Sequence, residues 1–312
     1  ISSEDAAVSA SDLNAINDLT TVAVDLTNVT SITSSSLIDL GILDTAIGNS
    51  EFSNATGLTT IAVSDTTIDA TTLSSTIDEY DSINGVGTTL MTLASGATIN
   101  IDASEIATIL GHETGSIAGG SRLTISDQNI VVTGNISVDE ANLLSATTEG
   151  TVTASITTTE SITELKTLTE TTNAYTIVIS SADATANAAD LSTIDGKTTA
   201  TVDASLVTTI SGTYDQITTL YESNGVTGLG NESINLDENL TVIKANVIDG
   251  LTEGVVTAVI DPSETVDALQ TLTGINAYTI VISSADATGS TASEFNTING
   301  LTTGTIDTTA VT

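Results

Sequence analysis

Eight aspartates stand at or near the ends of short β-branched runs, and they are the residues of this chain best suited to chemistry. They are Asp25, Asp65, Asp102, Asp127, Asp139, Asp203, Asp237 and Asp307. If successive strands stack in register, such carboxylates come to lie about 4.8 Å apart. Like charges repel at that distance, and Ca²⁺ held by carboxylate oxygens would relieve the repulsion. The candidate metal ligands are Asp25, Asp65, Asp102, Asp203 and Asp307.

The same aspartates also fit a structural role, which we favour. An Asp after a strand, followed by Ala-Ser or Glu, is typical of the N-cap of a helix or turn, where its side chain accepts from free backbone N–H groups. The chain contains no Asp-x-Asp-x-Asp-Gly loop of the EF-hand type. We therefore expect no required cofactor, with calcium as the candidate ligand of the aspartates.

Histidine chemistry rests on one residue, His112, which is followed by Glu113. A second His at helical spacing is missing, which removes the zinc-protease motif, and no Gly-x-Ser-x-Gly sequence marks a serine hydrolase. The absence of Cys removes thiolate catalysis and Cys-based zinc sites. We expect His112 to be an exposed loop residue without a catalytic role.

The charge balance limits the kinds of molecule that this chain can bind. Asp and Glu number 40 against 4 Lys and Arg, which gives a formal net charge of −36. Nucleic acid and anionic membrane surfaces are excluded as partners, because binding them needs clustered cations. No apolar run approaches the ~20 residues of a membrane span. The only cations are Arg122, Lys166, Lys197 and Lys244.

Aromatic residues are equally scarce, with five Tyr, two Phe and no Trp. A polysaccharide-active enzyme on a β-helix needs aromatic or cationic groups to hold the sugar, so it is the third and weakest functional hypothesis, and we expect no enzyme. Tyr175 and Tyr278 stand at identical positions near the start of two predicted strands. We expect both rings to plug the edge of the core and both hydroxyls to face water.

The elements that position these residues come in repeats. Residues 173–185, NAYTIVISSADAT, recur unchanged at 276–288. Upstream of them, residues 149–173 align with 253–276, which indicates a super-repeat of about 100 residues.

We accordingly treat residues 1–312 as one continuous repeat array. Super-repeats cover 149–252 and 253–312, the second copy being truncated, and more divergent repeats cover 1–148.

A smaller unit lies inside the super-repeat. Each copy has an acidic and a hydrophobic residue, then Thr-Thr, then a short run ending in or next to Asp; copies begin at Asp12, Glu51, Asp190 and Glu294. In the third copy, the helical spacing of Leu191 and Ile194 predicts one or two helical turns. The alternating run 199–203 predicts a strand.

This pattern predicts a repeat protein, a solenoid of stacked parallel β-strands with short interspersed helices. One strand and one short helix cannot bury their apolar faces alone, whereas stacked copies bury a continuous core. The spacing between predicted strands also supplies the dozen or more residues that a parallel crossover needs. The alternative is a set of tandem β-sandwich domains of about 100 residues each. The helical patterns favour the solenoid.

Residues 190–217, DLSTIDGKTTATVDASLVTTISGTYDQI, and 225–238, GVTGLGNESINLDE, resemble the Thr-, Ala- and Asp-rich repeats of giant bacterial cell-surface proteins of the cyanobacterial type. The resemblance implies secretion, great length, a structural or adhesive role and no catalytic residues. The Gly-rich nonapeptide of RTX calcium repeats, which such proteins often carry, is absent from this chain. The resemblance therefore does not carry calcium binding with it.

The two ends of the chain also fall inside repeats. Ile1 aligns with Ile179, and Thr312 aligns with Thr208, where the other copy continues. We expect either a window of a longer repetitive protein or a processed subunit completed by its neighbours. Uncovered strand edges favour end-to-end association, and contacts that do not close make filaments.

These observations predict an extracellular or cell-surface structural protein that forms, or belongs to, a filament by head-to-tail stacking of repeats. Its expected partners are other copies of itself, together with divalent cations or cell-surface glycans. The alternative function is a calcium-dependent adhesin or S-layer component.

Overall fold

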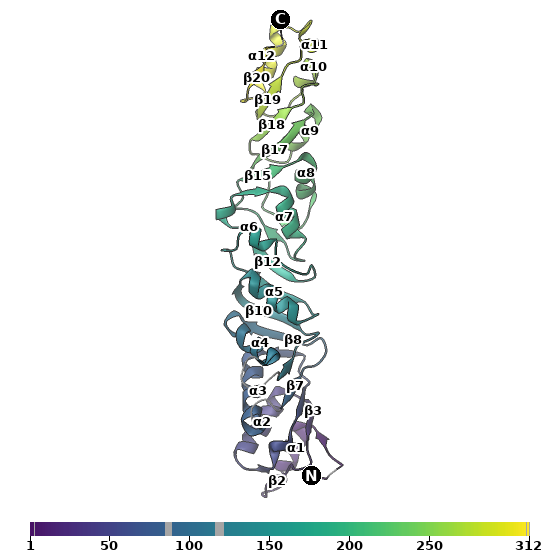
Figure 1. The fold of residues 1–312 in the computed structure, drawn as a ribbon, viewed down its shortest axis with the longest axis vertical. Coiled ribbons are helices and arrows are strands. Elements are labelled where there is room, and N and C mark those ends of the chain that lie inside the picture. The colour runs from purple at the N-terminus through teal and green to yellow at the C-terminus, as the bar shows by residue number, and fades with distance from the viewer. Residues whose placement is uncertain (3, 85–88, 116–121, 310, 312) are drawn as a thin grey trace. The chain divides into compact units, whose positions relative to one another are not determined.

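The computed structural model describes residues 1–2, 4–84, 89–115, 122–309 and 311 (Figure 1). Contacts divide the chain into two compact units, Ile1–Ser155 and Ile156–Thr312. Both units are α/β, with short strands alternating with short helices along the chain. The strands fall into four sheets, every strand pair with a described register is parallel, and the described residues form no closed barrel. This confirms the prediction of parallel strands with interspersed helices, and the antiparallel sandwich alternative is wrong.

The first unit contains ten strands and five helices among its described residues, with β11 (Val152–Ile156) at the junction of the two units. The strands are β1 (Ala7–Val8), β2 (Val24–Asp25), β3 (Ser31–Ser35), β4 (Phe52–Ser53), β5 (Thr60–Val63), β6 (Thr67–Asp69), β7 (Leu90–Thr92), β8 (Thr98–Asp102), β9 (Leu123–Thr124) and β10 (Asn129–Ile136). The helices are α1 (Ala10–Asn17), α2 (Leu37–Gly48), α3 (Ala70–Asn84), α4 (Ile106–Thr114) and α5 (Val138–Thr147), with 3-10 turns η1 (Ala55–Gly57) and η2 (Ala103–Glu105).

Each sheet of the first unit is built from strands that follow one another at intervals along the chain. Strands β1, β3, β5, β7 and β9 lie side by side in this order, β6, β8 and β10 are neighbours in a second sheet, and β2 pairs with β4. Ala7 is opposite Ser31, and Ser31 is opposite Thr60. The crossover between such partners includes a helix, which suits parallel pairing.

The second unit follows the same rule. Its strands are β12 (Ala174–Val178), β13 (Thr185–Asn187), β14 (Val202–Asp203), β15 (Thr209–Gly212), β16 (Val226–Thr227), β17 (Ser233–Leu240), β18 (Val256–Ile260), β19 (Ala277–Val281) and β20 (Ile306–Asp307). Its helices are α6 (Ile162–Leu165), α7 (Ala188–Asp195), α8 (Tyr214–Glu222), α9 (Val242–Asp249), α10 (Val266–Leu269), α11 (Ser284–Ala287) and α12 (Ala292–Gly300), with the 3-10 turn η3 (Ser181–Asp183). Strands β12, β14 and β16 are neighbours, and β13, β15, β17, β18, β19 and β20 form a sheet in that order.

Most helices begin at a Ser or Thr whose hydroxyl accepts a hydrogen bond from the N–H three residues on. Ser36 accepts from Asp39 N at the start of α2, and Thr213 accepts from Gln216 N at the start of α8. Such caps satisfy backbone donors that the first helical turn leaves free. The helices then pack in succession, α1 on α2, α2 on α3 and α3 on α4 in the first unit, and α7 on α8 and α8 on α9 in the second (Figure 1).

The core is a series of small aliphatic layers between the sheets and the helices. Leu191 and Ile194 are fully buried on α7, as their spacing predicted. The predicted strand at 199–203 is shorter, because only Val202 and Asp203 pair and the preceding Thr-Thr forms a side-chain-bonded turn. No helix of the described residues is long and apolar enough to span a membrane.

The four small copies predicted from sequence are not all alike. Phe295 lies in helix α12, whereas Phe52, its counterpart in the copy that begins at Glu51, lies in strand β4. That copy nevertheless has the 3-10 turn η1 before Thr59-Thr60, and strand β5 begins at the second of these threonines and ends two residues before Asp65, as the sequence pattern predicted. The other three copies have a helix before the Thr-Thr and a strand after it, α1 and β2, α7 and β14, and α12 and β20.

A longer succession of elements also occurs twice. β10, α5, β11, α6 and β12 are followed later by β17, α9, β18, α10 and β19 in the same order. Strands β12 and β19 have the identical sequence AYTIV. The division of residues 1–312 into one continuous array stays a prediction.

Candidate functional site

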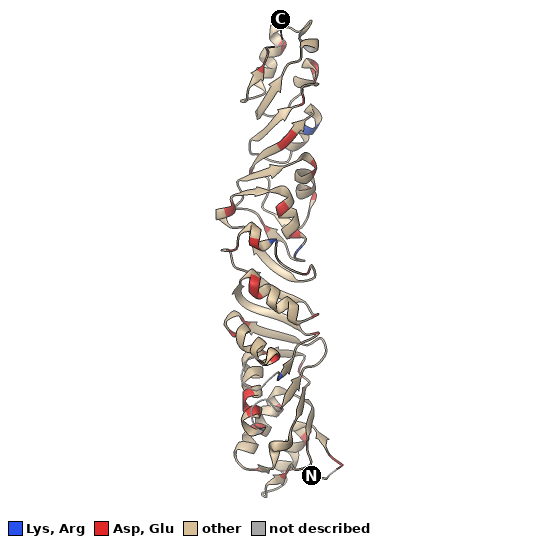
Figure 2. Cartoon of the chain, viewed as in Figure 1, with Lys and Arg blue, Asp and Glu red and all other residues tan. Residues whose placement is uncertain are grey.

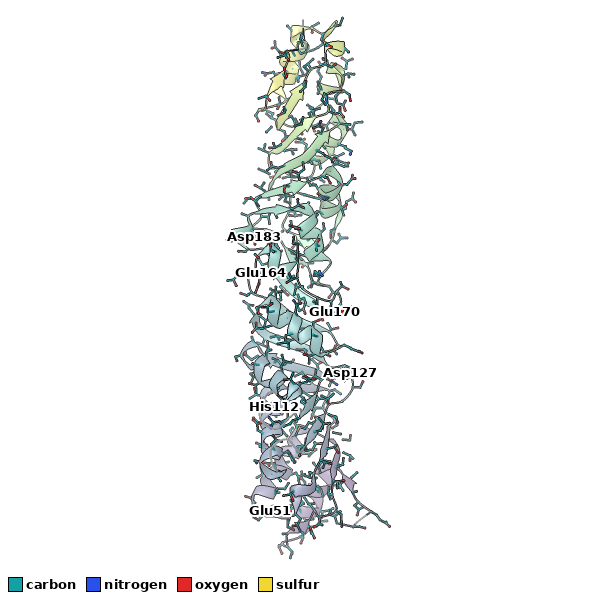
Figure 3. The ribbon with its side chains drawn as sticks, in the orientation of Figure 1. Glu51, His112, Asp127, Glu164, Glu170 and Asp183 are labelled. Carbon is teal, nitrogen blue, oxygen red and sulfur yellow. The ribbon has the colours of Figure 1, made fainter. Side chains whose placement is uncertain are left out.

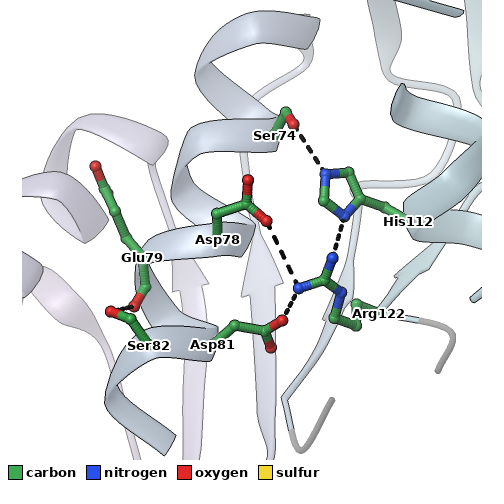
Figure 4. Close-up of polar contacts among 7 residues, drawn as sticks. All are labelled: Ser74, Asp78, Glu79, Asp81, Ser82, His112 and Arg122. Carbon is green, nitrogen blue, oxygen red and sulfur yellow. Dashed lines mark hydrogen bonds and ion pairs between the residues drawn. The ribbon is translucent and has the colours of Figure 1, made fainter. Parts of the chain in front are cut away.

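A cluster of polar side chains, three of them buried, lies in the first unit between helices α3 and α4 (Figure 4). Ser74, Asp78 and Asp81 come from α3, His112 comes from α4, and Arg122 directly precedes β9. His112 is 0% exposed and Arg122 is 2% exposed. The prediction that His112 is an exposed loop residue is therefore wrong, because helix α4 continues past it and turns its ring toward α3.

The hydrogen bonds fix the tautomer of His112. Its Nε2 lies 2.8 Å from Ser74 Oγ, and its Nδ1 lies 2.8 Å from Arg122 Nη2. A guanidinium can only donate, so Nδ1 accepts, and the proton of the neutral ring is on Nε2. Nε2 therefore donates to Ser74. Activation of a serine nucleophile needs the reverse arrangement, in which the imidazole accepts the hydroxyl proton.

The charge of Arg122 is balanced by two carboxylates of helix α3. Its Nη1 forms an ion pair with Asp81, whose side chain is 6% exposed, and lies 3.6 Å from Asp78, whose side chain is 63% exposed. Burial lowers the pKa of His112, and the nearby Asp78 carboxylate opposes this shift. A neutral His112 also avoids placing a second cation next to Arg122.

The space beside this cluster is small. A cleft of about 120 Å³ is lined by Ser74, Asp78, Glu105 and Thr108, among others. Ligand pockets commonly have volumes of roughly 300–1,000 Å³. The arrangement is best suited to holding α3, α4 and the start of β9 together.

Most of the candidate metal ligands accept hydrogen bonds from their own turns. In four of them a carboxylate oxygen accepts from the backbone N–H two residues on, at 2.9–3.0 Å: Asp25 from Thr27, Asp102 from Ser104, Asp203 from Ser205 and Asp307 from Thr309. Asp261, which sequence analysis did not single out, accepts from Ser263 N in the same way. The shared signal is Asp-x-Ser/Thr in which the Asp is the last residue of a strand or directly follows it.

These contacts have an electrostatic consequence. Hydrogen bonds from Asn54 and Thr27 lower the pKa of Asp25 to about 2. Bonds from Ser104 lower the pKa of Asp102, and bonds from Thr309 lower that of Asp307. Donors of the chain itself thus stabilise the ionised carboxylates.

The remaining candidates have varied surroundings. Asp65 Oδ2 accepts from Leu37 N at 2.7 Å, which caps helix α2 from the following layer. Asp127 accepts from the Ser95 hydroxyl and from Gln128 Nε2. Asp139 lies in the first turn of α5, and Asp237 is exposed within β17.

The described registers do not bring the candidate aspartates side by side. Asp203 lies between Val178 and Thr227, and Asp25 is opposite Ser53. Asp102 is opposite Thr133, and Asp307 is opposite Val281. Within the described residues, no three His, Asp or Glu side chains gather as a metal site would require. Calcium binding stays a prediction. Figure 2 shows acidic residues spread over the helices and turns of both units, with few basic residues among them.

The two repeat tyrosines are more deeply placed than expected. Tyr175 and Tyr278 are both 0% exposed. Tyr278 OH accepts from Asn276 Nδ2 at 3.1 Å, and burial raises the pKa of Tyr278 to about 12. The prediction of water-facing hydroxyls is wrong, because each ring enters the core from a central strand.

A set of buried threonines escaped sequence analysis. Thr198 Oγ1 accepts from Tyr175 N and donates to Tyr175 O, both at 2.8 Å. Thr302 does the same with Tyr278, at 2.9 and 2.8 Å. Thr252 Oγ1 donates to Glu232 O and accepts from Gly254 N, where an added Cβ would lie 2.3 Å from that carbonyl. The signal available in the sequence was Thr-x-Gly or Thr-x-Ala before a strand.

Strands at the ends of the sheets keep an open edge in the described part of the chain. Strand β2 pairs with β4 alone, and β20 pairs with β19 alone. The equivalent of β2 in the second unit, β14, lies between β12 and β16.

Comparison with known proteins gives no match. No known protein family matches the chain, and no curated protein or solved structure is significantly similar to it.

Proposed function

We propose that this chain is an extracellular structural protein whose repeats stack head to tail, as a solenoid, in a filament or surface fibre. The observation that carries the proposal is the parallel pairing of strands that follow one another along the chain, each with the next strand of its sheet. A sheet built in this way can add a further strand to the free N–H and C=O groups of its last strand. Repeats added in the same direction extend the sheet without closing it, which makes filaments.

The composition supports the same proposal. A net charge of −36 keeps neighbouring fibres hydrated and apart. Lys and Arg number only 4, which leaves few cleavage sites for trypsin-like proteases on an exposed protein. Ser74 accepts a hydrogen bond from the neutral ring of His112, whereas activation of a serine nucleophile would need the ring to accept one, so the cluster supports a structural role.

The test is electron microscopy of the purified chain at neutral pH, with and without millimolar EGTA. Filaments in both conditions are the expected result. Filaments or sheets that fall apart in EGTA would favour the alternative, a calcium-dependent adhesin or S-layer component held by exposed carboxylates. Monodisperse monomers in both conditions would overturn self-assembly.

A further inference from the structure

The first layer of the first unit has a close counterpart within the second unit. Residues 1–32 correspond to 179–210, so that α1 matches α7 and β2 matches β14. The hydrogen bonds agree as well. Ala6 O accepts from Thr30 N at 2.9 Å, and Ala184 O accepts from Thr208 N at 2.8 Å. The N-terminal amine of Ile1 donates to Asp25 O, as Ile179 N donates to Asp203 O.

In the second unit this layer is covered by residues 161–178, a helix–strand segment made of α6 and β12. At its start, Ile162 N donates to Asp183 Oδ2 at 3.1 Å. Figure 3 labels Asp183 together with Glu164, which lies in helix α6 two residues after Ile162. One turn on, Lys166 Nζ lies 2.7 Å from Asp190 Oδ1 of α7.

The strand of the covering segment is held by the Thr-Thr turn. Thr198 exchanges two hydrogen bonds with the backbone of Tyr175, and Thr199 N donates to Asn173 O at 2.8 Å. Strand β12 then pairs with β14, Ile177 opposite Val202. The same contacts recur where Thr302 and Thr303 hold the strand of Tyr278.

In the first unit, the residues that correspond to those holding the covering segment are exposed. Asp5, Asp12, Thr20 and Thr21 stand where Asp183, Asp190, Thr198 and Thr199 stand in the second unit, and all four are exposed. The turn is nevertheless formed in the same way, because Val22 N donates to Thr20 Oγ1 at 3.1 Å, as Ala200 N does to Thr198 Oγ1.

An apolar position and a cleft complete the face. Ile16 is 40% exposed, whereas its counterparts Ile194 and Ile298 are 0% exposed beneath their covering segments. A cleft of about 360 Å³ lies along this face, lined by Asp5, Asp12 and Ile16 among others. The uncovered surface therefore combines a carboxylate pair, an apolar contact and an open strand edge.

We propose that the face formed by α1, the Thr20–Thr21 turn and β2 binds a helix–strand segment with the chemistry of residues 161–178. That segment supplies a lysine for Asp12, an Asn-x-Tyr strand for the two threonines, and backbone groups for the open edge of β2, which is strand addition to a sheet. The inference rests on the proposed function in one respect, that the partner is a further repeat segment of this kind.

One residue of the face departs from its counterparts. Val22 stands where the second unit has Ala200 and Gly304, and a Cβ at Gly304 would lie 2.2 Å from Tyr278 O. The larger side chain keeps an added strand from approaching as closely as β19 approaches β20. Val22→Gly should therefore tighten binding of the segment.

The experiment measures binding of a synthetic peptide with the sequence of residues 161–178 to the chain of residues 1–312. Titration calorimetry gives the affinity, and hydrogen exchange locates the site. We expect saturable binding at millimolar concentrations or below, with new protection of the Thr21 amide, the counterpart of the Thr199 amide that donates to Asn173 O. No binding at millimolar peptide, or protection confined to residues outside α1, the Thr20–Thr21 turn and β2, would overturn the proposal.

Matched variants test the individual contacts. Thr20→Val should weaken binding about tenfold, because it removes a hydroxyl that exchanges two hydrogen bonds. Asp12→Lys should weaken binding of the peptide at least about twofold. A peptide that carries Lys166→Glu should recover the loss. Asp139→Lys, an exposed charge change on α5, is the control and should leave binding unchanged.

Peptide binding and electron microscopy together distinguish a failure of this inference from a failure of the proposed function. Peptide binding without filaments in the microscope would keep the acceptor face and remove self-assembly. Filaments that form while the peptide neither binds nor shortens them would remove the acceptor face and keep self-assembly.

Discussion

Replacing Asp81 by Asn should be among the most destabilising single changes in the first unit. The Arg122 side chain is 3% exposed, and its ion-pair partner Asp81 is 6% exposed. Removing one partner of a buried pair leaves the other charge uncompensated and costs about 3–5 kcal/mol. Asp78 makes the other ion pair to the same guanidinium at 3.6 Å but is 63% exposed. Asp78→Asn should therefore cost only about 0–1 kcal/mol.

Thermal unfolding followed by far-ultraviolet circular dichroism measures this difference. For a unit of this size, about 1 kcal/mol corresponds to roughly 2–4 °C in Tm. Asp81→Asn should lower the Tm of the first unit by about 6–20 °C, and Asp78→Asn by less than about 4 °C. The double variant Asp81→Leu/Arg122→Met should recover part of the loss, because no charge is then left buried, while His112 Nδ1 loses its donor.

Two results would refute the reasoning. Equal losses for Asp81→Asn and Asp78→Asn would mean that water compensates Arg122 in solution. A double variant as unstable as Asp81→Asn would mean that side-chain shape or the hydrogen bond from Arg122 to His112, instead of the buried charge, determines the stability of this cluster.

Further predictions concern titration, capping and the core. Burial holds the pKa of His112 below its ordinary 6.5. The neutral ring therefore contributes to stability above pH 6.5, and this contribution is lost as the pH falls below 6.5. The fall in Tm between neutral pH and about pH 5 should be smaller in His112→Gln. Asn54→Ala should raise the pKa of Asp25 from about 2 toward 3.8, read from carboxyl chemical shifts, and an unchanged value would contradict the assigned donor. Asp65→Ala should cost about 1 kcal/mol in urea unfolding, because Leu37 N loses its cap, and no loss would mean that water replaces it. Leu191→Ala should cost about 2–5 kcal/mol, and a loss below 1 kcal/mol would show that the layer relaxes around the gap.

The sequence predicted the local pattern better than it predicted burial. Helix α7 and strand β14 follow from periodicity, since Leu191 and Ile194 have helical spacing and Val202 is β-branched. The parallel arrangement follows from repeats separated by crossovers of sufficient length. Such inferences use only neighbours along the chain.

The polar cluster could not be predicted in this way. His112 and Ser74 are 38 residues apart, and Arg122 reaches Asp81 from another layer. Composition indicates that a lone histidine in an acidic chain is solvated, and only the packing of α4 on α3 reverses this expectation. The roles of the threonines were missed for a related reason, because a Thr-rich sequence hides the few threonines whose hydroxyls face inward.

The pairing of each strand with one further along the chain has a mechanical consequence. Thr257 is opposite Ala277, 20 residues on, and the crossover between strands β18 and β19 contains helix α10 and no strand. A pulling force that parts this pair releases only that crossover, while the next pair still holds. At about 3.3–3.6 Å for each extended residue, the release lengthens the chain by roughly 70 Å. Under tension each unit should therefore yield in a series of small steps, so that a stretched chain dissipates work gradually and can reform layer by layer when the load falls.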